Sequence, residues 1–186
     1  AQESGEKARI YRSIAEVHQN NDHQDGARQA WLNALEHEPE DREALAGLRS
    51  LAEAENDHKA VVGVLAREAA LVDGEEQIGL YARIAQIWDG DIGDAAVASE
   101  AWRKVMEMDS GNEEAIARLV ELTEAQEDWA GFVQYSEARV SQLEAGIEKS
   151  ALHFRIGLVH LEKLRDEAKA VEFLAQAASG EAPQLD

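Results

Sequence analysis

Residues 11–39 read YRSIAEVHQNNDHQDGARQAWLNALEHEP, and this stretch decides the fold. Its bulky side chains at Tyr11, Ile14 and His18 are spaced i, i+3 and i+7, which places them on one face of a helix. The run Asn20-Asn21-Asp22 that follows has the composition of a turn. The first half of the stretch therefore predicts a helix that ends in a tight turn.

The second half of the stretch carries another apolar stripe with helical spacing. This stripe consists of Ala27, Ala30, Trp31, Ala34 and Leu35. Small alanines beside a bulky tryptophan suit close packing of two helices, because one side makes room and the other fills it. Pro39 ends this second helix, and Glu40-Asp41 caps the next one. The stretch as a whole predicts a helical hairpin.

The hairpin recurs along the chain. A shift of 71 residues takes Ala30-Trp31 to Ala101-Trp102, and a shift of 70 takes the run from Tyr11 to Ala15 onto the run from Tyr81 to Ala85. A further shift of 72 takes Ile84-Ala85 to Ile156-Gly157. Half of this period is the length of one helix–turn–helix repeat, roughly 35 residues. Each period therefore holds two hairpins.

The spacing resembles that of the tetratricopeptide-repeat (TPR) family. The pattern is Tyr11-x-x-Ile14-Ala15-x-x-His18, followed by Ala27-x-x-x-Trp31-x-x-Ala34-x-x-x-x-Pro39, and only His18 departs from the residue types of the family. The third repeat fits with one inserted residue, at Tyr81, Ile84, Ala85, Trp88, Ala98, Trp102 and Val105. The fifth repeat also fits, and the second and fourth are weaker. The resemblance covers nearly the whole chain as five repeats.

We therefore predict an all-α protein, a right-handed α-solenoid of about five TPR-like repeats. Its helices are expected at 5–20, 26–37, 41–55, 58–72, 76–89, 94–108, 112–126, 129–144, 147–163 and 167–178. Residues 1–178 would form a single solenoid, and residues 179–186 a disordered C-terminal tail. The resemblance implies a concave surface that can hold an extended peptide or a helix.

The composition limits the partners. The chain has 38 acidic and 18 basic residues and a formal charge of −20, which disfavours nucleic acid and anionic membranes and favours a basic protein segment. Alternatively, the charge serves only solubility. No apolar run approaches the ~20 residues of a membrane span, so we expect no membrane insertion. The chain has no cysteine, which excludes disulfides, thiolate metal sites and a cysteine nucleophile.

Composition is the evidence in the sequence for the compartment and the source organism. A chain without cysteine can reside in the cytoplasm or the periplasm, and we favour the cytoplasm for a soluble protein of this kind. The alanine- and acid-rich composition favours a bacterial source. The chain has no initiator methionine and no signal-like start, so we expect a segment excised from something longer, or a processed protein.

The resemblance implies which residues line the concave groove. These candidate partner-binding residues are Arg9, Arg12, Glu16, Glu53, Gln86, Glu121, Glu124, Phe154, Leu158 and Leu161. The groove would begin basic, become acidic and end apolar, and its middle favours a partner that carries Lys or Arg. The Lys and Asn residues of chaperone-tail clamps are absent. The alternative is that these helix faces are merely solvated.

The apolar end of the groove allows two interpretations. Phe154, Leu158 and Leu161 are spaced i, i+4 and i+7 on a helix that is apolar on most sides. Further repeats or a capping helix would cover this face, or a partner would dock there; the need of terminal repeats for a polar outer face favours the first interpretation. Self-association through the same face is a third possibility.

Metal and catalytic sites have little support. The segment Asp89–Asp94 with Glu100 is similar to a calcium loop, but Asp94 replaces the glycine such a loop requires. His153 and His160 share a helix face without a third ligand. There is no nucleophile elbow, phosphate loop or dinucleotide motif. We expect no metal, no cofactor and no enzymatic activity.

The remaining aromatic residues fit the packing pattern. Trp31, Trp88 and Trp102 fall on repeat packing positions and are expected in the core, whereas Trp129 is less constrained. The sequence therefore predicts a protein–protein interaction or scaffold module. The alternatives are a substrate-recruiting segment of a larger enzyme and a self-assembling structural protein.

Overall fold

The computed structural model describes residues 2–180, and this part of the chain is all-α, as predicted. Its α-helices are α1 (Gln2–Asn20), α2 (Gln24–His37), α3 (Arg42–Ala54), α4 (His58–Ala69), α5 (Gly74–Gln86), α6 (Ala95–Met108), α7 (Glu113–Ala125), α8 (Trp129–Gln142), α9 (Ile147–Val159) and α10 (Glu167–Ser179). Two π-helical turns, η1 (Ile87–Ile92) and η2 (His160–Leu164), extend α5 and α9. Each predicted helix is present.

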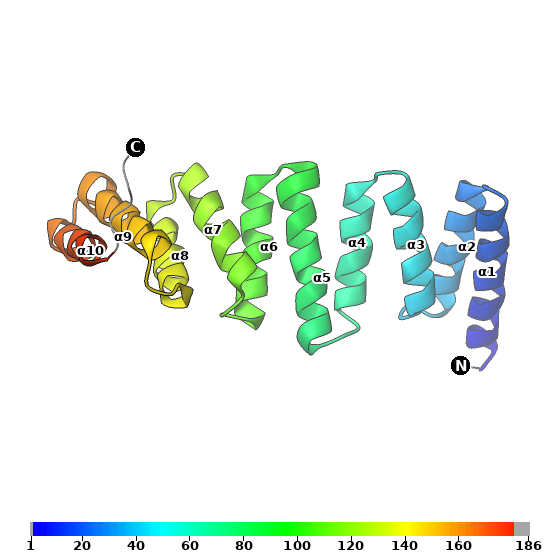
Figure 1. The fold of residues 1–186 in the computed structure, drawn as a ribbon. Coiled ribbons are helices and arrows are strands. Elements are labelled where there is room, and N and C mark those ends of the chain that lie inside the picture. Colours follow the sequence, from blue (N-terminus) through cyan, green and yellow to red (C-terminus); the bar gives the residue numbers. More distant parts are fainter. Residues whose placement is uncertain (1, 181–186) are drawn as a thin grey trace. The chain divides into compact units, whose positions relative to one another are not determined.

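The helices form two compact units. Unit 1 extends to Asp94 and contains α1–α5 and η1; unit 2 begins at Ala95 and contains α6–α10 and η2. Within each unit, successive helices pack against one another as hairpins (Figure 1). The two helices of the third repeat, α5 and α6, belong to different units. A single solenoid over residues 1–178 stays a prediction, and most of the predicted tail, 181–186, lies outside the described residues.

Each hairpin turns through one residue with a left-handed backbone. These residues are Asp22, Asn56, Gly93, Glu127 and Arg165, with φ between 55° and 74°. In three of the turns the next residue is an aspartate (Asp57, Asp128 and Asp166) whose side chain accepts a backbone N–H of the second helix at 3.0–3.1 Å. This arrangement ends one helix and caps the next within two residues.

The π-helical turns explain why the repeat spacing varies. In the hairpin of α3 and α4, the N–H of Asp57 donates to the carbonyl of Ala52 at 2.9 Å. In the hairpin that contains η1, the N–H of Asp94 donates to Trp88, one residue further back, at 3.0 Å. The hairpin that contains η2 repeats this contact between Asp166 and His160. The inserted residue of the third repeat is therefore absorbed in a π-turn.

Within each unit, the core lies between the helices that pack against one another. The predicted stripe of α2 is buried throughout, and Trp102 of α6 is buried as well. Trp31 packs where Gly47 of α3 leaves room, since a Cβ on Gly47 would lie 2.3 Å from the indole. The expectation for Trp88 was wrong, because it is only partly buried.

Ile14 was also predicted to be a packing residue, and it is exposed. Its neighbours Tyr11 and His18 are half-buried, and Ala15 is fully buried. The helix therefore turns a different face to α2 than the spacing of its largest side chains suggests.

Candidate protein-binding surfaces

In unit 1, the predicted groove residue Arg12 is tied into the fold. Its guanidinium donates to Asp41 at 2.8 Å and lies 3.2 Å from Glu43. Asp41 is buried and accepts the N–H groups of Glu43 and Ala44, so it caps α3. Arg12 thus holds α1 against the first turn of α3, in addition to any role toward a partner.

The other groove candidates of unit 1 are spread over three helices. Arg9 and Glu16 are exposed on α1. Glu53 is exposed at the end of α3, where its carboxylate lies 3.7 Å from Arg49. Gln86 is half-buried at the end of α5. These side chains therefore come from α1, α3 and α5.

In unit 2, the two acidic groove candidates are paired with arginines. Glu121 pairs with Arg118 on the same helix, α7, and Glu124 pairs with Arg155 of α9. All four side chains are exposed, and exposed ion pairs contribute about 0–1 kcal/mol. A basic partner can therefore compete with these arginines at small cost.

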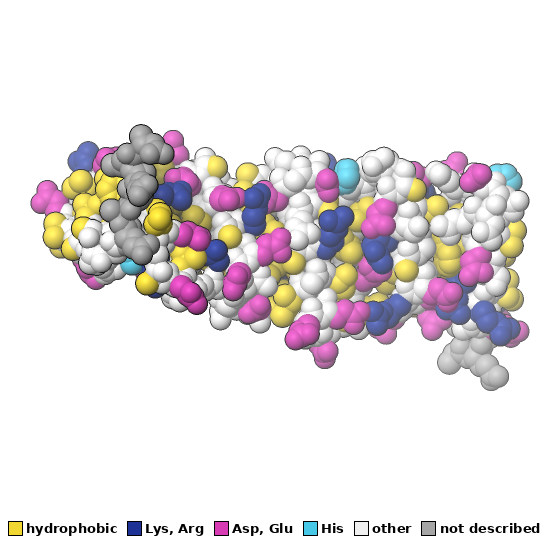
Figure 2. Space-filling view, in the orientation of Figure 1, with side chains coloured by type: hydrophobic (Ala, Val, Ile, Leu, Met, Phe, Trp, Pro, Cys, Tyr) yellow, Lys and Arg dark blue, Asp and Glu magenta, His cyan; other side chains and the backbone are white. Residues whose placement is uncertain are grey.

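The apolar candidates lie on α9 (Phe154 and Leu158) and η2 (Leu161), close in sequence to Arg155 of that pair. Phe154 and Leu161 are exposed and Leu158 is half-buried, whereas Ile156 and Val159 point into the core. Figure 2 shows apolar side chains among charged ones at the end of unit 2 formed by α9 and α10. The helix is thus apolar on two sides, and only one of them is covered among the described residues.

A shallow hollow adjoins this surface. Its volume is about 260 Å³, and it is lined by Ala117, Val120, Glu121, Arg139, Glu148, Ala151, Leu152 and Arg155 of α7, α8 and α9. Arg139 donates to Glu148 at 3.4 Å, and the guanidinium of Arg155 lies 5.2 Å above the ring of Phe132. The hollow can accept one small side chain between charges of both signs, and it is not an enclosed reaction chamber.

Two further aromatic contacts of unit 2 were missed by sequence reasoning. Lys163 of η2 lies 4.8 Å above the ring of Trp129, which also meets Phe132 edge-on. His160 is buried and stacks on Phe173 of α10 at 5.6 Å. Lys163 and Trp129, and likewise His160 and Phe173, come from different helical elements, so helical spacing alone carries no signal for these two contacts.

His153 lies against the same phenylalanine ring, at 6.1 Å. Burial lowers the pKa of His153, and the nearby Lys149 lowers it further. Between residues 2 and 180, no group of three His, Asp or Glu side chains could hold a metal ion. His153 and His160 therefore act as packing residues between α9 and α10.

None of the described helices is long and apolar enough to cross a membrane. Successive helical hairpins that pack against one another within each unit define an all-α helical-repeat protein. No family model and no curated protein matches the sequence.

Three solved structures show partial similarity to this chain. YrrB, described as a TPR protein with an unusual peptide-binding site, is 13% identical, with 90% of this chain and 82% of that chain covered and a TM-score of 0.47. MamA from Desulfovibrio magneticus RS-1 is 18% identical, with 94% of each chain covered and a TM-score of 0.47. PilF from Pseudomonas aeruginosa is 14% identical, with 91% and 74% covered and a TM-score of 0.47.

Proposed function

We propose that this chain is a protein–protein interaction module, and that unit 2 binds a basic, amphipathic segment of a partner protein across α7 and α9. The observation that carries the proposal is the stripe of exposed Phe154 and Leu161 and half-buried Leu158, joined to the acidic residues of α7 through the ion pair of Arg155 with Glu124. Apolar side chains give affinity to such a surface, and the neighbouring carboxylates select the charge of the partner.

The chemistry of the partner follows from this pairing. An amphipathic helix would lay its apolar face on the stripe of α9. Lys or Arg at the edge of that face would replace Arg118 and Arg155 as partners of Glu121 and Glu124. The groove residues of unit 1 (Arg9, Arg12, Glu16, Glu53 and Gln86) remain candidates for contacts with other parts of a partner.

The proposal can be tested with a defined probe. A fluorescent helical peptide built from leucine and lysine should bind the chain, and its leucine–glutamate counterpart should not, because the chain carries a charge of −20. Anisotropy titrations measure both affinities. Phe154→Ala should weaken binding of the lysine peptide by about tenfold, a typical loss for an aromatic anchor.

Charge specificity needs a matched control, since any acidic protein attracts a polycation. Glu121→Lys with Glu124→Lys should weaken binding and leave the melting temperature nearly unchanged, since both ion pairs are exposed. Glu137→Lys with Glu144→Lys changes the net charge equally, at exposed positions outside α7 and α9. Equal losses in the two double variants would mean that only net charge matters, and the proposed surface would be wrong.

A further inference from the structure

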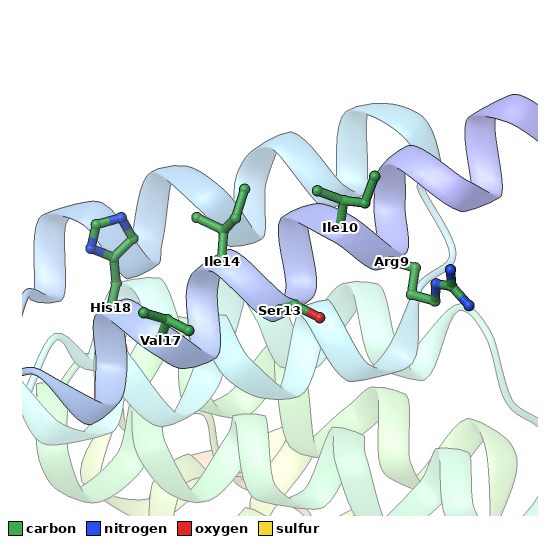
Figure 3. Close-up of a pocket in the computed structure, with 6 residues that line it drawn as sticks. All are labelled: Arg9, Ile10, Ser13, Ile14, Val17 and His18. Atoms are coloured by element: carbon green, nitrogen blue, oxygen red, sulfur yellow. The ribbon is translucent and has the colours of Figure 1, made fainter.

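The first helix presents an apolar stripe to solvent. Ile10, Ile14 and Val17 are spaced i, i+4 and i+7 on α1 and are 51%, 39% and 60% exposed. Together with Arg9, Ser13 and His18 they border an open hollow of about 560 Å³ (Figure 3). Three neighbouring aliphatic side chains are seldom left exposed without a partner.

The same positions are covered in the other first helices. Positions can be matched by counting back from the left-handed residue of each turn. The stripe of α1 then corresponds to Ala44, Leu48 and Leu51 of α3. With one more residue for the π-turn, it corresponds to Leu80 and Ile84 of α5 and Ile87 of η1. All of these are buried except Leu80, which is half-buried, and the equivalent residues of α7 and α9 are buried too. In each case the preceding helix (α2, α4, α6 or α8) packs against the helix that carries these residues.

The second helix of a hairpin packs against the first helix of the next hairpin. Three contacts identify the positions of the second helix that face this neighbour. Arg28 of α2 pairs with Glu55 at the end of α3, and Trp31 packs on Gly47. In the next joint, Ala69 of α4 accepts a hydrogen bond from the Gln77 side chain of α5 at 2.8 Å. These positions lie 6, 9 and 13 residues after the left-handed residue.

In α4 the three facing positions are Val62, Leu65 and Ala69. The last helix, α10, has the same residue types there: Val171, Leu174 and Ala178. Val171 is 69% exposed, Ala178 is exposed, and Leu174 is half-buried against Gly157 of α9. Among residues 2–180, α10 therefore carries a facing stripe (Val171, Leu174 and Ala178) with two exposed side chains, and α1 carries an exposed receiving stripe (Ile10, Ile14 and Val17).

We infer that α10 of one copy packs on α1 of a second copy and reproduces the joint between α4 and α5. That joint connects α4, with Val62, Leu65 and Ala69 at the facing positions, to α5 and η1, with Leu80, Ile84 and Ile87 at the receiving positions. In the proposed contact between copies, Val171, Leu174 and Ala178 of one copy pack against Ile10, Ile14 and Val17 of the next. Lys7 takes the place of Gln77, and its amine can donate to the carbonyl of Ala178.

This contact joins two different surfaces, so each copy retains one open end. Such a heterologous contact adds further copies rather than stopping at a dimer, unless the rotation closes a ring. The charge of −20 on each copy opposes association, and the joint itself is apolar. Salt screens the repulsion and should strengthen the contact. This inference goes beyond the proposed function, because it uses neither Phe154 nor the acidic residues of α7.

Sedimentation velocity of the 186-residue chain tests the inference. Over rising concentration the average mass should pass that of a dimer, and more so at high salt. Ile14→Asp blocks the receiving stripe and Val171→Asp blocks the facing stripe, so each variant alone should be monomeric. An equimolar mixture should form a heterodimer and nothing larger, because each variant supplies the surface that the other lacks.

Leu32→Asp is the matched control. Leu32 of α2 is 40% exposed, much like Ile14, but lies outside both stripes, so this variant should assemble as the unaltered chain does. Circular dichroism checks that the variants stay folded, and Val17→Asp serves in place of Ile14→Asp if that variant unfolds.

A chain that stays monomeric at every concentration and salt would overturn the inference. An average mass that stops at that of a dimer would also overturn the inference. A mixture of the two variants that stays monomeric would do the same. Peptide binding at α7 and α9 is measured separately, so either proposal can fail alone.

Discussion

The joint between α2 and α3 in unit 1 and the joint between α6 and α7 in unit 2 derive from the same repeat but are held by different side chains. Trp31 and Trp102 occupy the same position, 71 residues apart. At the edge of the first joint, Arg28 pairs with Glu55. At the edge of the second, the Gln126 amide donates to the Ser99 hydroxyl at 3.0 Å and to the Ala95 carbonyl at 2.8 Å.

The residue at the position that leaves room for Trp31 also differs between the joints. Gly47 of α3 leaves room for Trp31, whereas Arg118 of α7 stands at the position equivalent to Gly47. The comparison indicates that the repeat fixes the backbone turn and the buried indole. An ion pair and a neutral hydrogen-bond network are interchangeable at the edge, where both are open to water.

The largest effect should come from the two tryptophans. Trp102→Ala should lower the free energy of unfolding by ~3–5 kcal/mol, because it truncates a fully buried core residue. Trp31→Ala should fall at the lower end of that range, since the indole N–H of Trp31 is buried without a hydrogen-bond partner among the described residues. Urea unfolding followed by circular dichroism measures both values. Equal stability of Trp102→Ala and the unaltered chain would place Trp102 outside the core.

The next effect concerns the close approach in unit 1. Gly47→Ala should destabilise by ~1–3 kcal/mol, because its Cβ would overlap the Trp31 ring. Gly63→Ala in α4 is the control: nothing lies within 4 Å of its Cβ, so the higher helix propensity of alanine should stabilise by about 0.5–1 kcal/mol. Thermal unfolding should therefore shift in opposite directions for the two substitutions. A shift in the same direction would mean that helix propensity, rather than the indole contact, governs position 47.

These contacts mark the limit of what the sequence could predict. Helical spacing predicted the helices and the buried stripe of α2, because both depend on residues close in sequence. The same spacing could not predict that Ile14 is exposed, since a pattern defines an apolar face and not what covers it. The ion pairs of Arg12 with Asp41 and of Arg155 with Glu124 join residues 29 and 31 positions apart, so they required the packed hairpins.

The π-turns show a second limit. Alignment of the third repeat with the first revealed one inserted residue. An extra residue can lengthen a loop, form a bulge or widen a helical turn, and the pattern of side chains is similar in the three cases. Only the hydrogen bond from Asp94 to Trp88 distinguishes them.

A smaller effect is expected at the edge of the second joint. Gln126→Ala removes two hydrogen bonds that tie the end of α7 to the start of α6, and it should cost about 1 kcal/mol. Both contacts are between neutral groups, so the loss should be the same at low and high salt. Hydrogen exchange should show faster exchange in α6 and α7 and no change in α3. A loss that disappears at high salt would contradict the neutral character of this joint.

The smallest effect is expected for the ion pair that replaces this network in unit 1. Arg28→Ala should cost about 0.5 kcal/mol at low salt and less at high salt, because both partners are partly exposed and ions screen their attraction. Urea unfolding at two salt concentrations measures the difference. If Arg28→Ala instead costs as much as Gln126→Ala at every salt concentration, the aliphatic part of the arginine side chain would be supporting the joint by packing. Packing contacts would then stabilise both edges. The replacement of an ion pair by neutral hydrogen bonds would not change the stability of the joint.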